Sequence, residues 1–313
     1  MRTSPFLMVV LAACGDVDSG SLPDAPAAPD AAISADAAMA DSPVTPVACD
    51  STKRWDTPVP VPGLAISGAY QESVRLSPDE LSAYFQRLDL GRWNLYAAHR
   101  SSRSEPFGAP IALSTVNSPA GDMDPWISSD GLTLWFASDR VQNQGSHLYV
   151  ATRTTTLAEF GAPGLAANVN ASNAELSELQ PFVTAGGEEL WFASNRSAGA
   201  DWEIYRALRT PTGFGMPAIV AELASSTSTD WLPMLSADRL TVYFSSSRPG
   251  TGTKGNLDVW TARRSTVNDG FPPPVLADEL NTPGGDRVTW LSGDGCRIYG
   301  SSDGAIWMAT RLP

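Results

Sequence analysis

The chain has 313 residues, 42% of them hydrophobic, so it can hold one large domain or two ordinary ones with a real core. Its formal net charge of −13 argues against a nucleic-acid partner, because phosphate backbones are bound by clustered Lys and Arg. Two His and three Cys residues, far apart and without metal-ligand spacing, argue against a zinc site.

Residues 1–14 have the pattern of an export signal. Arg2 supplies a positive charge, and the short apolar stretch Phe6–Val10 follows it. The segment closes with Leu-Ala-Ala-Cys, ending at Cys14, which resembles the lipobox of bacterial lipoproteins. The resemblance implies that Cys14 becomes a lipidated N-terminus and, since Gly15 rather than Asp follows, that the protein passes to the outer membrane. The alternative is an ordinary cleaved signal with an incidental cysteine.

Residues 15–50 have a different composition, rich in Ala, Asp, Pro and Ser. They include seven Asp and no Lys or Arg. Such a segment buries too little apolar surface to offset its ordering entropy, and its charges and prolines favour extended conformations. We expect a disordered tether between the lipid anchor and a folded domain at 51–313. No apolar run is long enough for a transmembrane helix, so the lipid would be the only membrane attachment.

One short pattern occurs five times after residue 95. It consists of an aromatic residue, Ala two positions later and Arg two positions after that. The copies lie 47–56 residues apart and begin at Tyr96, Tyr149, Tyr205, Trp260 and Trp307. A period in this range is typical of repeat folds built from supersecondary units.

Each repeat contains four strand-like pieces. An outer segment with an aromatic residue and Pro comes first, as in Phe160–Pro163. A strand ending in a tight Asp-Gly turn at Asp130 follows. The next strand, Leu132–Ala137, is apolar on both faces, as in a sheet covered on both sides. The aromatic-x-Ala-x-Arg strand is last. These features predict an all-β, five-bladed β-propeller of four-stranded antiparallel blades.

The second strands are expected to match one another at an aromatic or aliphatic pair. The proposed matches are Tyr84-Phe85, Trp135-Phe136, Trp191-Phe192, Tyr243-Phe244 and Ile298-Tyr299.

The motifs resemble those of the TolB-like, WD-repeat-like propeller family of exported bacterial proteins. Pro125–Gly131, Phe136–Arg140 and Glu203–Tyr205 carry the likeness, which covers about residues 55–313. The first repeat departs from the pattern at Phe85–Asp89, and the last has Asp303 in place of Arg. Members of this family are scaffolds, binding domains and, less often, parts of enzymes, so the resemblance implies the fold more than the function.

The order of the pieces predicts how the ring closes. The first repeat begins with an outer segment at 55–66, and the last ends with a third strand at 305–311, so the former should complete the sheet of the latter. Cys49 precedes that outer segment, and Cys296 follows the last inner turn on the same face. We expect a Cys49–Cys296 disulfide, the alternative being two unpaired thiols.

Four repeats carry an acid at one position, three residues before a Pro or its equivalent. These acids are Asp122, Glu178, Asp230 and Asp286, with Gln71 at the same place in the first repeat. They could line the channel mouth as a calcium or ligand site, or supply the two carboxyls of a glycosidase, since five-bladed propellers host such enzymes. The repetition favours a structural role instead, with ion pairs to Arg140, Arg196 and Arg248 of neighbouring blades.

No other chemistry is indicated. No catalytic triad or nucleophile elbow is visible, no cofactor or metal is implied, and the arginines of the repeated pattern are expected to be solvated or bound at sheet edges. Trp93, Trp202 and Trp231 could form a binding surface or pack beneath loops. The sequence therefore favours a non-catalytic module that binds another envelope protein or a peptide. The alternative is a carbohydrate-binding or glycoside-hydrolase-like propeller.

Overall fold

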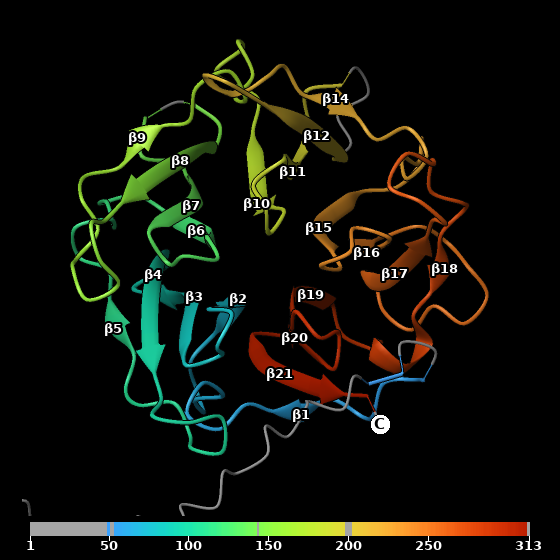
Figure 1. The fold of residues 1–313 in the computed structure, drawn as a ribbon, viewed down its shortest axis with the longest axis horizontal. Helices are drawn as coiled ribbons and strands as arrows, with labels where there is room; N and C mark the ends of the chain where they lie inside the picture. Colours follow the sequence, from blue (N-terminus) through green and yellow to red (C-terminus); the bar gives the residue numbers. More distant parts are fainter. Residues whose placement is uncertain (1–48, 51–52, 143, 198–201, 312–313) are drawn as a thin grey trace, which may run out of the picture. The chain divides into compact units, whose positions relative to one another are not determined.

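A computed structural model describes residues 49–50, 53–142, 144–197 and 202–311. The described residues form five β-sheets around a central axis, as Figure 1 shows. The predicted five-bladed propeller is confirmed. The expected signal segment, Cys14 and nearly all of the expected tether lie outside the described residues. Within the described part, no helix is long and apolar enough to cross a membrane.

Each blade has four antiparallel strands counted outward from the axis. The innermost strands are β2 (Gln71–Leu76), β6 (Asp122–Ile127), β10 (Glu178–Val183), β15 (Asp230–Leu235) and β19 (Asp286–Leu291). The second strands are β3 (Ser82–Asp89), β7 (Thr133–Ser138), β11 (Glu189–Ser194), β16 (Thr241–Ser246) and β20 (Arg297–Ser302). The third strands are β4 (Arg92–His99), β8 (His147–Thr152), β12 (Glu203–Thr210), β17 (Asp258–Arg263) and β21 (Ala305–Thr310). The short outer strands are β5 (Ile111–Ala112), β9 (Gly164–Leu165), β14 (Ala218–Ile219), β18 (Val275–Leu276) and β1 (Val59–Pro60).

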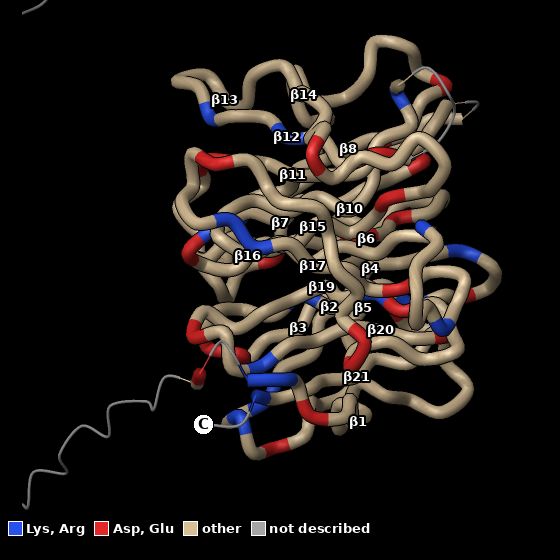
Figure 2. Tube along the Cα trace, turned by 90° about the vertical axis from the view of Figure 1, so that its right-hand side faces the viewer, with Lys and Arg blue, Asp and Glu red and all other residues tan. Residues whose placement is uncertain are grey.

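Blades 1 to 5 are numbered by their innermost strands in chain order. Blade 3 also has β13 (Gly213–Phe214), which pairs with the end of β12, and a single 3-10 turn, η1 (Asp278–Leu280), follows β18. The inner strands start on one face of the ring, called here the acid face after Asp122 and its equivalents. They end in tight turns on the opposite face, called here the turn face. In the side view of Figure 2, Lys and Arg segments are interspersed with Asp and Glu segments.

The ring closes through the N-terminal end of the propeller, as predicted. Strand β1 pairs with β21 in blade 5, and Val59 lies opposite Met308. A disulfide joins Cys49 to Cys296 on the turn face of the same blade. Strand β1 thereby covers the edge of β21 that would otherwise be unpaired.

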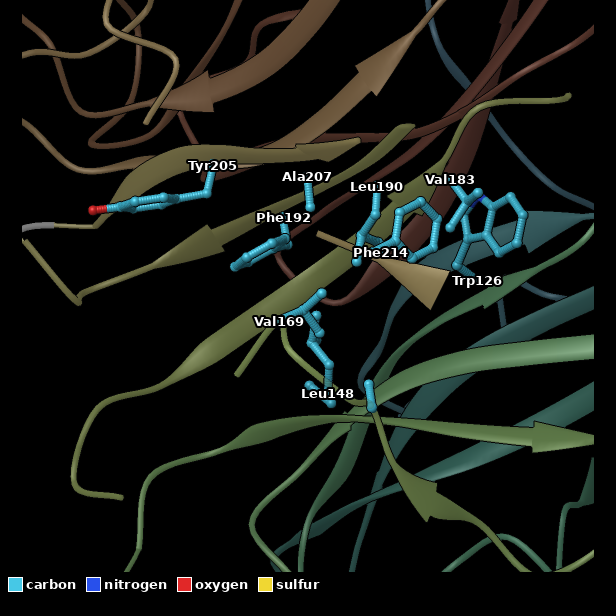
Figure 3. Close-up of a cluster of buried hydrophobic side chains, with 11 residues drawn as sticks. Trp126, Leu148, Val169, Val183, Leu190, Phe192, Tyr205, Ala207 and Phe214 are labelled. Carbon is cyan, nitrogen blue, oxygen red and sulfur yellow. The ribbon is translucent and has the colours of Figure 1, made fainter. Parts of the chain in front are cut away.

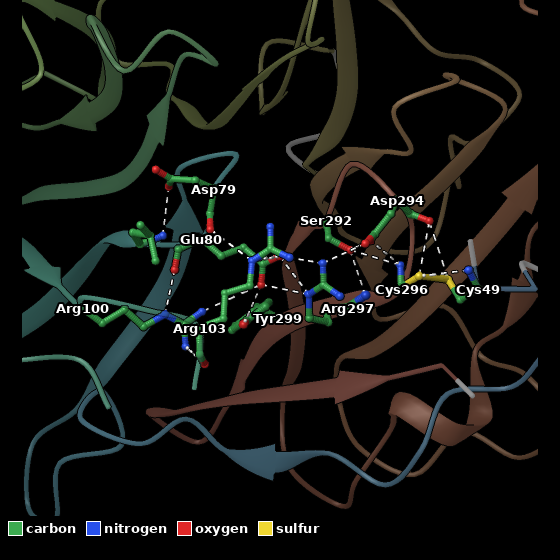
Figure 4. Close-up of polar contacts among 11 residues, drawn as sticks. Cys49, Asp79, Glu80, Arg100, Arg103, Ser292, Asp294, Cys296, Arg297 and Tyr299 are labelled. Atoms are coloured by element: carbon green, nitrogen blue, oxygen red, sulfur yellow. Dashed lines mark hydrogen bonds and ion pairs between the residues drawn. A yellow bond between two sulfur atoms is a disulfide. The ribbon is translucent and has the colours of Figure 1, made fainter. Parts of the chain in front are cut away.

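Blades 5 and 1 are also joined on the turn face by ion pairs to a buried carboxylate. Glu80 in blade 1 is 1% exposed, and Arg297 Nη2 of blade 5 lies 2.7 Å from its Oε1. Figure 4 shows this pair beside the Cys49–Cys296 disulfide, together with the other contacts of Glu80. Tyr299 donates a hydrogen bond of 3.3 Å to Glu80. The disulfide and the contacts of Glu80 therefore hold blade 5 to the N-terminal part of the propeller.

The hydrophobic core lies between the blades. One cluster, shown in Figure 3, joins blades 2 and 3 through Trp126, Leu148, Leu190 and Phe192. Ala207 is 0% exposed in this cluster. Each repeated Ala is buried in the same way, because a small side chain lets neighbouring sheets approach. These buried alanines are Ala98, Ala151, Ala207, Ala262 and Ala309.

Near the axis, the inner strands of blades 1 to 4 contain a bulge with a left-handed residue. The positive φ angles are 55° at Ser73, 53° at Asp124, 59° at Gln180 and 55° at Leu232. The bulges direct polar groups from blade to blade. Ser73 donates to Asp124 at 2.7 Å, and the Leu232 N–H donates to Gln180 at 3.0 Å. Side chains thus link adjacent blades around the axis.

The predicted match of Ile298-Tyr299 in blade 5 is wrong by one position. Phe136 pairs with Tyr149 in blade 2, whereas Gly300 pairs with the equivalent Trp307. A Cβ on Gly300 would lie 2.4 Å from the Trp307 ring. The tryptophan therefore fills the space that phenylalanine fills elsewhere, and Tyr299 takes the place of the first aromatic residue of the pair.

Candidate functional site

The acids expected at the channel mouth are buried, and three are paired with arginine. Asp122, Glu178, Asp230 and Asp286 are each 0% exposed. The Nη2 atoms of Arg140, Arg196 and Arg248 lie 2.7, 2.8 and 2.7 Å from their carboxylates. The sequence-based expectation of bridges between blades is wrong in detail, because each bridge joins the inner and second strands of one blade.

Each of these arginines is held on several sides. Arg140 donates to Ser138 Oγ at 2.9 Å and to the Val116 carbonyl at 3.0 Å. Its guanidinium carbon also lies 5.0 and 4.6 Å from the ring centroids of Phe136 and Tyr149. An arginine fixed in this way neutralises the carboxylate in place, so the acid position is a structural element of the blade.

Asp286 is the exception among the four acids. Asp303 and Gly304 form a tight turn in blade 5, in the region where blades 2 to 4 carry arginine. The Thr282 N–H and hydroxyl donate to the Asp286 carboxylate at 2.6 and 3.0 Å. Burial raises the pKa of Asp286. Among the described residues, no group of three or more His, Cys, Asp or Glu side chains is arranged to hold a metal ion.

A second set of charged residues lies further along the inner strands, with Glu72 and Arg287 directly after the acid position and Asp124 and Arg75 two and four positions after it. The sequence analysis did not single it out. Arg287 Nη1 lies 2.7 Å from Glu72 Oε1, joining blades 5 and 1. Asp124 and Arg75 are 7% and 3% exposed and interact electrostatically near the axis. For Glu72 and Arg287 a sequence signal was available, because both are charged residues directly after the acid position. The other three blades have Met123, Leu179 and Trp231 there.

The two carboxyls of this axial set have perturbed acidity. Burial raises the pKa of Glu72, with Asp124 adding to the effect and Arg287 opposing it. Burial also raises the pKa of Asp124, against hydrogen bonding by Ser73 and the charge of Arg75. Burial lowers the pKa of Arg75 to about 10. Because this pKa is still well above 7, Arg75 is charged at neutral pH. Two carboxyls with raised pKa on adjacent blades form a chemically plausible site.

The three tryptophans on the acid face are half-buried in aromatic pairs. The Trp93 ring lies 5.8 Å from Tyr70, and the Trp202 and Trp231 rings lie 6.0 Å apart. Each ring packs against a neighbouring ring and is partly exposed, and a binding role for this surface stays a prediction.

An open cleft of about 760 Å³ lies on the turn face, at the junction of blades 1 and 2. Its wall includes Tyr84, Ala97, Ile111, Ile127 and Phe160. We call it the blade 1–2 cleft. Clefts of 300–1,000 Å³ with mostly apolar walls are typical ligand sites. The sequence analysis did not predict it.

Small side chains keep the blade 1–2 cleft open. Blade 1 has Ser82 and Ala97 where blade 3 has Glu189 and Arg206, and blade 5 has Arg297 and Met308. In blade 3 the two charged groups lie 3.8 Å apart and fill the junction. Blade 1 also has Tyr84 at the place of Trp191 in blade 3. The cleft is thus a local departure from the repeat.

Polar groups are placed at fixed points along the cleft. Arg153 donates to the Tyr84 hydroxyl at 2.9 Å and to the Gly131 carbonyl at 2.7 Å, and it stacks on Phe160. Ser82 Oγ lies 2.9 Å from His99 Nδ1. Burial lowers the pKa of His99, and Arg153 adds to the effect, so the imidazole is neutral at pH 7.

Comparisons with known proteins extend the structural result. No protein-family model and no curated protein sequence matches the chain. A thermostable family-43 glycoside hydrolase has a TM-score of 0.56 at 11% identity, over 82% of this chain and 93% of that one. A glycoside hydrolase described as putative from Parabacteroides distasonis has a TM-score of 0.53 at 15% identity, over 86% and 95%.

TolB from Acinetobacter baumannii is also similar, with a TM-score of 0.49 and 18% identity over 77% of this chain. The chain spans about half of that structure, 54% of its length. At these identities the likenesses concern the fold alone. The propeller fold is shared with glycoside hydrolases, and a shared fold does not by itself decide the function.

Proposed function

We propose that this protein is an exported propeller that binds an extended protein segment or peptide in the blade 1–2 cleft and has no catalytic activity. The observation that supports the proposal is the cleft itself, about 760 Å³ at a place that blade 3 fills with the Glu189–Arg206 ion pair. The acids that could have served catalysis at the acid position are held by arginine in three of four cases.

The walls of the cleft suit a peptide. Tyr84, Ile127 and Phe160 supply apolar and aromatic surface, and Ile111 at the rim is 63% exposed. Leu157 on the blade 2 side is 97% exposed. Exposed apolar side chains on both rims of a rigid cleft are the kind of anchor point that peptide recognition uses.

Selection from a random nonapeptide library on the full-length protein tests the proposal. Peptides enriched on the wild type should bind the Ile111→Ser variant at least about tenfold more weakly, because the apolar contact at the rim is lost while the charge of the cleft is unchanged. Val275→Ser is the matched control, since Val275 occupies the same position in blade 4 and is 61% exposed. Failure to enrich any peptide, or equal loss in both variants, would rule the cleft out as the binding site.

The proposal includes attachment to the cell envelope through lipid on Cys14, with the outer membrane as the destination. Its support is the lipobox-like sequence and the Cys49–Cys296 disulfide, which fits an oxidising compartment outside the cytoplasm. Metabolic labelling with a palmitate analogue should mark the wild type and leave Cys14→Ser unlabelled. Equal labelling of the two would remove the anchor from the account.

A second candidate is a carbohydrate-binding or glycoside-hydrolase-like site on the acid face. Glu72 and Asp124 favour it, because both carboxyls have raised pKa and Glu72 is hydrogen-bonded to Tyr70, whose ring lies 5.8 Å from that of Trp93. Hydrolysis of a panel of aryl glycosides by the wild type, lost in Glu72→Gln and in Asp124→Asn but kept in Ile111→Ser, would favour catalysis. No hydrolysis of any substrate would favour the binding module.

A further inference from the structure

We infer that the blade 1–2 cleft takes a peptide segment in which Lys or Arg flanks an apolar side chain, an inference that rests on the proposed peptide-binding function. The protein is acidic overall, with a net charge of −13, but the inference depends on the local arrangement. Charge at the rim of an interface selects partners of opposite sign and speeds their association.

Three carboxylates and one guanidinium line the cleft. The acids are Asp79, Asp130 and Glu159, and the base is Arg153. His99 is neutral at pH 7, as argued above, and the buried Tyr84 hydroxyl has a pKa raised by burial, so it is neutral too. Three negative charges and one positive charge give the cleft a net charge of −2.

The two turn aspartates stay ionised over the whole physiological range. Ser77 Oγ and the Leu81 N–H donate to Asp79, and these hydrogen bonds lower its pKa. Ser128 and the Leu132 N–H do the same for Asp130 in the equivalent turn of blade 2. Both carboxylates lie on exposed turns, so a cation can reach them without being buried.

Arg153 belongs to the wall of the cleft. Its donors are directed to the Gly131 and Ala158 carbonyls and to the Tyr84 hydroxyl, and its guanidinium carbon lies 4.4 Å from the Phe160 ring centroid. It therefore sits against apolar surface, beside which an apolar side chain of the peptide can pack. The aspartates stand on the turns at either side.

The junction of blades 4 and 5 provides an internal contrast. Its cleft of about 160 Å³ is lined by Asp238 and Asp294 together with Arg263 and Arg311, two acids and two bases. Asp238 occupies the same turn position as Asp79 and is likewise held by a serine hydroxyl and a backbone N–H. The smaller and electrically balanced cleft has neither the room nor the net charge, so recognition of a cationic peptide is specific to blades 1 and 2.

Titration of the full-length protein with three labelled nonapeptides tests the inference. They share one Gly/Ser frame and differ at the centre, which reads Lys-Leu-Lys, Ser-Leu-Ser or Glu-Leu-Glu. The first should bind at least about tenfold more tightly than the last at low ionic strength, with the difference shrinking as salt is added. The double variant Asp79→Asn/Asp130→Asn keeps the turn acceptors, brings the cleft to zero net charge and should lose the preference. Asp238→Asn is the matched control and should keep it.

The outcomes separate this inference from the proposed function. Equal binding of the three peptides to the wild type, weakened by Ile111→Ser, would overturn the cationic preference and leave peptide binding in place. A preference that persists in Asp79→Asn/Asp130→Asn would place its origin elsewhere and overturn the inference. Absence of binding by these peptides and by any peptide from the random library would overturn both.

Discussion

Arginine occupies two repeated positions in this chain, and in both its guanidinium lies against aromatic rings. One set pairs with the buried acids. The other is the Arg of the aromatic-x-Ala-x-Arg pattern, whose guanidinium carbon lies 4.2–4.5 Å from the ring centroid of an outer-segment aromatic residue in every blade. We expected the second set to be solvated or edge-bound. The spacing of seven residues between Arg153 and Phe160, which recurs from Arg264 to Phe271, was the available signal.

Removing one arginine of the first set tests how much the buried acids depend on it. Arg140→Ala would leave Asp122, 0% exposed, without its counter-charge, and we predict a loss of about 3–5 kcal/mol in the free energy of unfolding. Arg263→Ala, whose partner Asp238 lies 4.0 Å away with both side chains about half exposed, should cost less than about 1 kcal/mol. Urea unfolding measures both. Similar losses in the two variants would contradict a structural role for the acid position.

Asp130 should make stability depend on pH in the acid range. Its pKa is lowered in the fold by Ser128 and by the Leu132 N–H, so the ionised form favours folding. This contribution is present above the unfolded pKa of about 3.9 and is lost as the pH falls through the folded pKa. The difference in unfolding free energy between the wild type and Asp130→Asn should be constant from pH 5 to 7 and shrink below about pH 4. A difference that stays constant down to pH 2 would show that ionisation plays no part.

At the scale of elements, the outer segments fasten each blade to the one before it. Phe160, Phe214 and Phe271 meet the second-strand aromatic residue of the preceding blade edge-on, with ring centroids 6.4, 5.6 and 6.3 Å apart. The outer strands themselves have only two residues each. Side-chain packing, more than main-chain pairing, therefore holds this layer in place.

Shortening one of these anchors should destabilise the whole propeller. Phe214 is 3% exposed and packs between Trp135 and Arg209, so Phe214→Ala should lower the free energy of unfolding by about 3–5 kcal/mol. Met216, two residues later and 82% exposed, provides the control, and Met216→Ala should change it by less than about 0.5 kcal/mol. Thermal unfolding by circular dichroism compares the two. An unchanged midpoint for Phe214→Ala would show that the outer segment can detach freely.

The number of blades, the order of strands and the closing strand could be predicted from sequence because they depend on periodic features. The repeated Ala and the tight turn after the inner strand recur at one place per repeat, and the aromatic pair does so in blades 1 to 4. Blade 5 was misaligned by one residue at Tyr299 because Gly300 breaks the pattern and Trp307 compensates from the adjacent strand. Such a compensation between strands is invisible until the pairing is known.

The blade 1–2 cleft could not be predicted for a related reason. It results from two small residues, Ser82 and Ala97, together with a Tyr84 that is smaller than the Trp191 of blade 3. Their equivalents in blade 3 fill the same space with an ion pair and a larger ring. Which residues share a junction follows from the register of neighbouring strands, so the sequence signal has meaning only after the strands are aligned.

At the scale of the whole molecule, closure of the ring depends on contacts between the two ends of the propeller. The Cys49–Cys296 disulfide spans 247 residues, and Arg297 pairs with Glu80 beside it. We predict that Cys49→Ser/Cys296→Ser lowers the free energy of unfolding by about 3–5 kcal/mol, because so long a loop restricts the unfolded chain. Guanidinium unfolding with and without reductant measures this. A wild type that is indifferent to reductant would contradict it.

A crystal structure of the protein with the tightest peptide from the selection tests the central claim most directly. We predict that the peptide lies in the blade 1–2 cleft, with a basic side chain beside Asp79 or Asp130 and an apolar one against Ile127 and Phe160, while the Arg140–Asp122 pair is unchanged. Peptide on the acid face, beside Glu72 and Asp124, would contradict the claim and make the axial carboxyls the functional site.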